Sequence, residues 1–314
     1  MKQSLFESRH QPDWDAFNSQ LEALERGKAE AQTCQSFAAR YRQLCQHLAL
    51  AQARGYSSHL IDQLQQLAMR GHQQFYRHRS HLGAQTIRFL FGGFPRLVRS
   101  EWRSVCVASL LFFGSLALMG LLTYLYPEPI FSLVSADQVS EMERMYDPDA
   151  RRLGRFSERG SGEDWVMFGF YIMNNIGIAF QTFASGLLLG LGSLFFLLFN
   201  GLMIGAVAGH LTRIGYGEPF WSFVIGHGAF ELTAIALAGA AGFKLGWALL
   251  APGRLTRSEA LRLAAGKAIQ LVAGVILFLL LAAFIEAFWS STTFASPNIK
   301  YAVGAGLWAL VLGY

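Results

Sequence analysis

The feature that most constrains the fold is a long stretch without formal charge. Between Asp164 and Arg213 the sequence contains no Asp, Glu, Lys or Arg. An α-helix rises about 1.5 Å per residue and about 20 apolar residues cross a bilayer, so this stretch is too long for one upright helix. It predicts two membrane-spanning helices, over residues 165–182 and 186–211, with a tight turn near 184–186.

Four further apolar segments predict the remaining spans of an all-α, polytopic membrane helix bundle with about six spans. They cover residues 104–126, 220–243, 263–289 and 301–314. Only 15% of the residues are charged, and the formal net charge is +5. Much of the positive charge flanks the spans, where it sets topology, so it does not indicate nucleic-acid binding.

The first part of the chain is polar and predicts a soluble N-terminal helical domain over residues 1–83. Three amphipathic helices are expected: one capped by Asp13, one over 31–54, and one capped by Ser57 or Ser58. Their apolar stripes can bury one another as a small bundle, or dock against the membrane domain or a partner. No apolar segment typical of a secretory signal peptide precedes them.

A short segment with alternating aromatic and basic residues, 84–103, separates this domain from the transmembrane bundle of 104–314. It predicts an interfacial juxtamembrane helix or elbow around Pro95. Its arginines are expected to face anionic lipid headgroups, although an ordinary basic flank of the first span accounts for the same residues. These membrane-surface arginines are Arg88, Arg96, Arg99 and Arg103.

Loop charges test the number of spans. The outer loop 127–164 carries five arginines against nine acidic residues, and its segment 136–146 predicts a short amphipathic helix. The loop 244–267 is basic, like the N-terminal domain. Six spans place both basic parts in the cytoplasm, as the positive-inside rule requires, whereas five spans would place 244–267 outside. We therefore expect six spans, with a cytoplasmic N-terminus.

Glycines recur in the predicted third span at intervals of four residues, at Gly201, Gly205 and Gly209. This spacing aligns them on one helix face and lets a second helix approach closely. The sequence therefore predicts a compact packing seam along this span.

The predicted spans contain very few ionisable residues, and three of these are His227, Glu231 and Glu286. His227 and Glu231 are four residues apart, so a helix places them on one face, and Glu286 lies in the outer half of the next span. An acidic group in a span costs a few kcal/mol on insertion scales, so such residues usually have a partner or a task. Asn174, Asn175 and Asn200 add polar groups at depth, which predicts one intramembrane polar site.

This polar site has three interpretations. Its groups could fix helix register through interhelical hydrogen bonds. His227, Glu231 and Glu286 could instead bind a divalent metal such as zinc, with water in the fourth position, in an intramembrane hydrolase. They could also form the proton relay or substrate site of a transporter. The spacing matches no catalytic motif, so we assign no catalytic residue and predict no cofactor.

Several segments together resemble a known family. NNIGIAFQTFASGLLLGLG, LLFNGLMIGAVAGHL, IGHGAFELTAIALAGAAGFKLG and AAFIEAFW are similar to the stage II sporulation protein M family of integral membrane proteins. The resemblance covers about residues 88–314. The residues that match its motifs are Asn174, Asn175, Gly186, Gly190, Asn200, Gly201, His227, Gly228, Glu231 and Glu286.

The resemblance implies a function as well as a fold. The N-terminal domain and the long outer loop resemble a longer branch of non-sporulating bacteria, so a sporulation role is not implied. Family members of the sporulation branch anchor a machine that remodels the cell wall. The resemblance therefore implies a scaffold of a cell-envelope complex, without an established enzymatic activity. Its implied protein partners are a MoxR-type AAA+ ATPase and von Willebrand A-domain proteins, with membrane lipid around it; homo-oligomerisation stays open.

Overall fold

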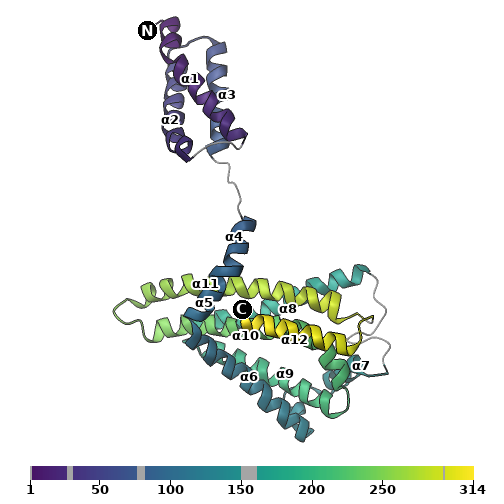
Figure 1. Ribbon diagram of the computed structural model, residues 1–314. Helices are drawn as coiled ribbons and strands as arrows, with labels where there is room; N and C mark the ends of the chain where they lie inside the picture. Colours follow the sequence, from purple (N-terminus) through teal and green to yellow (C-terminus); the bar gives the residue numbers. More distant parts are fainter. Residues whose placement is uncertain (1, 27–30, 76–81, 150–160, 293) are drawn as a thin grey trace. The chain divides into compact units, whose positions relative to one another are not determined.

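The computed structural model describes residues 2–26, 31–75, 82–149, 161–292 and 294–314. Throughout these residues the fold is all-α, as predicted. The chain divides into two compact units, residues 1–83 and residues 84–314 (Figure 1). Each unit has hydrophobic clusters of its own, so each is described by itself.

The N-terminal unit consists of three helices, α1 (Gln3–Glu25), α2 (Ala31–Ala53) and α3 (Ser58–Phe75). The prediction that Asp13 caps the first helix is wrong, because α1 begins ten residues earlier and continues through Pro12. The extra turns bury Phe6 against Trp14. Burial of such a ring contributes about 1.5–3 kcal/mol, which offsets much of the roughly 3 kcal/mol cost of a proline inside a helix.

The predicted juxtamembrane segment is largely helical, with a break at Glu101 before α6 (Trp102–Leu125). It contains α4 (Leu82–Arg88), the π-helix η1 (Phe89–Gly93) and α5 (Phe94–Ser100). The Phe94 ring is buried against Gly274, and a side chain at that glycine would overlap the ring. The four predicted membrane-surface arginines are all exposed.

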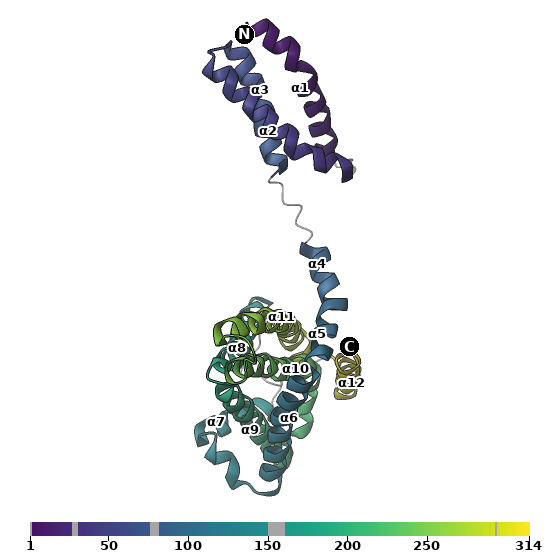
Figure 2. The same cartoon turned by 90° about the vertical axis from the view of Figure 1, so that its left-hand side faces the viewer.

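The membrane unit is a bundle around one central helix, α10 (Gly217–Leu250). This helix packs against α6, α8, α9, α11 and α12, and Figure 2 shows it between them. Their bounds are α6 (Trp102–Leu125), α8 (Ser161–Ala184), α9 (Leu191–Arg213), α11 (Arg257–Phe284) and α12 (Pro297–Gly313). A run of small residues, 238–242, is fully buried in α10, and it allows neighbours to approach on several sides.

By length and composition, four of the described helical stretches can cross a membrane: α6, α9, α10, and α11 with the π-helix that continues it. Two more helices run between the ends of the bundle. In α8, Trp165 contacts Phe288 at one end, and at the other Thr182 accepts a hydrogen bond from Ser193 at the start of α9. The chain is therefore a polytopic membrane protein, and its number of spans is roughly consistent with the predicted six.

The start of α6 and the basic loop between α10 and α11 lie at the same end of the bundle. Glu101, just before α6, accepts hydrogen bonds from Lys244 on α10 (2.7 Å) and Lys267 on α11 (3.3 Å). A five-span arrangement would have separated these residues by the membrane. The contact favours the six-span topology over that alternative.

The predicted glycine seam joins α9 to α6. Gly201, Gly205 and Gly209 all face α6, and a Cβ at Gly205 would collide with the Leu116 carbonyl oxygen. Glycine is required here because the two backbones are in contact.

The loop after α6 contains a 3₁₀ turn, η2 (Glu128–Ser132), and the helix α7 (Ala136–Tyr146), which confirms the predicted short amphipathic helix. A capping box of Ser135 and Gln138 starts α7. Glu143 on α7 binds His210 on α9 through a hydrogen bond of 2.7 Å. Helix α7 is therefore fixed to the C-terminal end of α9.

Candidate functional site

Helix α10 supplies the first two polar residues of the site. His227 and Glu231 lie one turn apart, and His227 Nε2 is 3.8 Å from Glu231 Oε2. The imidazole is buried, with 4% of the residue exposed, and the glutamate side chain is 20% exposed. The helix therefore places both groups on one face, as the spacing predicts.

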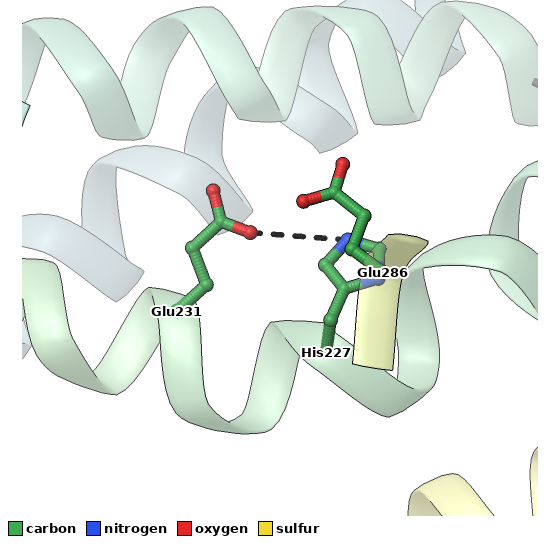
Figure 3. Close-up of side chains that lie close together, drawn as sticks. All are labelled: His227, Glu231 and Glu286. Carbon is green, nitrogen blue, oxygen red and sulfur yellow. Dashed lines mark ion pairs between the residues drawn. The ribbon is translucent and has the colours of Figure 1, made fainter. Parts of the chain in front are cut away.

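The third residue comes from the end of α11. Glu286 lies on the π-helix η4 (Ile285–Ser290), which continues α11. One ligand atom from each of His227, Glu231 and Glu286 can be chosen so that all three atoms lie within 4.8 Å of one another. Figure 3 shows the three side chains turned toward one common space. Single-turn π-helical segments are frequent at functional sites.

Neighbouring side chains orient the imidazole of His227. Its Nδ1 lies 3.0 Å from Ser290 Oγ, and the ring packs edge-on against Phe223. Lys300, in the first turn of α12, donates hydrogen bonds of 2.8 Å to the carbonyl oxygens of Ser290 and Thr292. This leaves Nε2 facing the two carboxylates, and α12 fixes the end of the π-helix.

Helix α7 contributes Tyr146. Its ring packs edge-on against Phe220 and Phe223 of α10. Burial raises the pKa of Tyr146, and the charges of Glu286 and Glu231 raise it further. The phenol is therefore neutral at physiological pH and lies within electrostatic reach of both carboxylates.

The predicted asparagines have separate environments. Asn174 is exposed and donates a hydrogen bond of 3.0 Å to Asn175 Oδ1, while Asn175 is buried. Among the described residues, Asn175 Nδ2 has no hydrogen-bond partner. Asn200 donates a hydrogen bond of 2.7 Å to the Phe196 carbonyl oxygen of its own helix. The structure thus brings His227, Glu231 and Glu286 together, whereas the three asparagines make hydrogen bonds elsewhere.

Sequence reasoning missed two contributors, Tyr146 and Ser290. Ser290 lies four residues after Glu286, so helical spacing could have indicated that the two share a face. No sequence signal marks Tyr146, because its position depends on how the outer loop folds back.

The close approach of His227, Glu231 and Glu286 permits both metal binding and proton transfer, each of which requires the groups to lie together. Ligand atoms more than about 10 Å apart could not hold one metal ion, and these three are much closer. The set can also exchange a proton between an imidazole and a carboxylate, as a relay does. A purely structural pair of His227 and Glu231 uses the same contact.

Comparison with known families identifies the membrane unit. The profile of the stage II sporulation protein M family matches residues 109–291, more than half of the chain. The chain belongs to this family. The match includes His227, Glu231 and Glu286, and it confirms the resemblance drawn from the sequence motifs.

A second profile matches the N-terminal unit. Residues 4–77 correspond to a domain family of unknown function, DUF8413. This additional domain is consistent with a longer, non-sporulation branch of the stage II sporulation protein M family.

Individual relatives add little about function. An uncharacterized protein of Methanocaldococcus jannaschii is 29% identical over 85 residues, which cover 26% of this chain. The matched region spans 47% of that protein's length. No solved structure matches the chain.

Proposed function

We propose that this protein is an inner-membrane scaffold of a bacterial cell-envelope complex, and that residues 1–83 recruit its cytoplasmic partners. The observation that carries the proposal is the division of the chain into a membrane bundle and a separate helical unit with its own core. A domain that supplies no helix to the bundle is free to bind another protein.

The surface of the N-terminal unit supports a role in binding. Leu5, Leu50 and Met69 are large apolar side chains that remain exposed, between 43% and 61%. Such side chains are available for contact with a partner, and a shared binding patch is what the variants below test. The family resemblance names a MoxR-type AAA+ ATPase and von Willebrand A-domain proteins as the candidates to test.

The proposed orientation follows from charge. Lys244 and Lys267 lie at the same end of the bundle as the exposed arginines Arg99 and Arg103. Clusters of Lys and Arg near span ends favour the cytoplasmic side. We therefore place the N-terminal unit in the cytoplasm, where an ATPase would be accessible.

The experiment is an affinity purification of the full-length chain from detergent-extracted membranes, beside a form that lacks residues 1–83. We expect a stoichiometric partner with the full chain and none with the shortened form. Met69→Glu, which changes one exposed apolar residue, should weaken recovery, whereas Gln65→Glu, on the same helix, serves as the charge control. Equal recovery with and without residues 1–83 would contradict the proposal.

A second candidate function is a metal-dependent hydrolase or a transporter within the membrane. The convergence of His227, Glu231 and Glu286 within 4.8 Å favours it. Complementation of a deletion strain separates the two candidates. If the protein is a scaffold, complementation should require residues 1–83 and tolerate His227→Ala. If the polar site carries out chemistry, complementation should be lost with His227→Ala.

A further inference from the structure

We propose that His227, Glu231 and Glu286 together bind one divalent transition-metal ion of the zinc class. This inference is independent of the scaffold role, because an ion can serve either to join two helices or to act on a substrate. It rests on the placement of the donor atoms and of the groups that orient them.

The donor spacing suits a small ion. Zinc binds histidine nitrogen and carboxylate oxygen at about 2.0–2.2 Å, so ligand atoms in a tetrahedral site lie about 3.4 Å apart. His227 Nε2 and Glu231 Oε2 are already 3.8 Å apart, and all three donors lie within 4.8 Å. Rotation of the two flexible glutamate side chains closes the remaining difference without movement of a helix.

The donor types select the class of metal. One imidazole nitrogen with two carboxylates suits zinc and neighbouring transition metals, whereas calcium and magnesium prefer sites made only of oxygen. Three protein ligands leave one tetrahedral position for water or another oxygen. The ion would also offset the cost of two carboxylates in a low-dielectric region.

The orientation of His227 matches that of a metal ligand. Metal-binding histidines almost always use their second ring nitrogen in a hydrogen bond that fixes the ring. His227 Nδ1 lies 3.0 Å from Ser290 Oγ, which leaves Nε2 directed at Glu231. The π-helix Ile285–Ser290 thus supplies one ligand, Glu286, and the group that orients another.

The outer face of the site is covered by an aromatic cluster. Tyr146 packs on Phe223, and Phe223 packs on His227, with ring centroids 6.0 and 5.4 Å apart. Tyr146 lies within electrostatic reach of Glu231 and Glu286.

The test uses the full-length chain, purified in detergent, stripped with a chelator and titrated with Co²⁺ and then Zn²⁺. We expect about one equivalent of metal per chain and the visible absorption of four-coordinate Co²⁺, which Zn²⁺ abolishes. His227→Ala and Glu286→Gln should each weaken binding more than about a hundredfold, since even loss of an outer partner costs roughly 10–100-fold. Ser290→Ala should cost about tenfold.

His210→Ala is the matched control, because His210 pairs with one carboxylate, Glu143, outside the three-residue set. It should bind metal as the unchanged chain does. Absence of binding by the unchanged chain overturns the proposal. So does equal binding by the His227→Ala chain, which means an adventitious ion only. The titration of the unchanged chain is decisive even where a variant fails to fold, and it needs no partner protein.

Discussion

Individual glycines determine how closely α9 approaches α6. At Gly201, Gly205 and Gly209 the atoms that a methyl group would meet belong largely to the α6 backbone, which cannot rotate away as a side chain can. A carbonyl oxygen is fixed by its own helix, so an added methyl group must push the two helices apart.

Gly205→Ala should therefore destabilise the bundle. Overpacking of this kind costs typically 1–3 kcal/mol, and here the Leu116 carbonyl oxygen receives the clash. Gly114→Ala is the matched control on α6, because a Cβ there meets nothing within 4 Å. Thermal unfolding in detergent should show a lower midpoint for the first variant and no loss for the second. An unchanged midpoint for Gly205→Ala would contradict the close contact.

At the scale of whole elements, one carboxylate ties the ends of three helices. Glu101 precedes α6 and binds Lys244 of α10 and Lys267 of α11. Burial by itself would raise the pKa of Glu101, but the hydrogen bonds and charges of the two ammonium groups outweigh it and lower the pKa. The folded chain therefore stabilises the ionised form.

This linkage predicts a pH dependence. Because the folded pKa of Glu101 lies below its ordinary value of 4.5, the contribution to stability is complete at neutral pH and is lost as pH falls below 4.5 through the folded value. Glu101→Gln should lower stability at pH 7 by about 1–2 kcal/mol. The difference from the unchanged chain, measured by thermal unfolding, should shrink toward pH 3. A constant difference would assign the effect to packing instead.

Within the same cluster, Lys244→Gln is expected to cost more than Lys267→Gln. The Lys244 side chain is 19% exposed, whereas that of Lys267 is 58% exposed and better screened by solvent. Equal losses would show that solvent exposure does not control these ion pairs.

For the whole molecule, the arrangement of the helices determines which segments share a side of the membrane. The contact of Glu101 with Lys244 and Lys267 places the start of α6 at the same end as the α10–α11 loop. The opposite end carries α7, the π-helix η4 and the start of α12, where Lys300 binds the Ser290 carbonyl oxygen. The candidate site lies toward this second end.

The topology predicts a difference in chemical labelling between the two ends. In a chain whose native cysteines are replaced, Ser258→Cys should resist an impermeant thiol reagent added to intact cells, while Ser140→Cys should react. Both positions are exposed in the structure, so accessibility depends only on the side of the membrane. Reaction at position 258 would contradict the six-span orientation.

The sequence predicted part of the candidate site. Helical spacing placed His227 and Glu231 on one face, and span depth placed Glu286 in the same half of the bundle, because both follow from helical rise and rotation. Asn200 was predicted to belong to the polar site, but its side chain donates a hydrogen bond to the Phe196 carbonyl oxygen of its own helix. The start of α1 was mispredicted because the burial of Phe6 against Trp14 is a tertiary contact that outweighs the local signal of Pro12 and Asp13.

The sequence by itself determined the all-α membrane fold, the approximate spans and the family. Apolar length and the absence of charge are local properties, and a bilayer admits few ways to satisfy the backbone. Only the tertiary structure decided which side chains meet. Rotation of each helix about its axis depends on packing against its neighbours, so the convergence of Glu286 with His227, the hydrogen bond to Ser290 and the cover by Tyr146 required the assembled bundle. The apolar stretches predicted the helices, and close packing positioned their few polar groups.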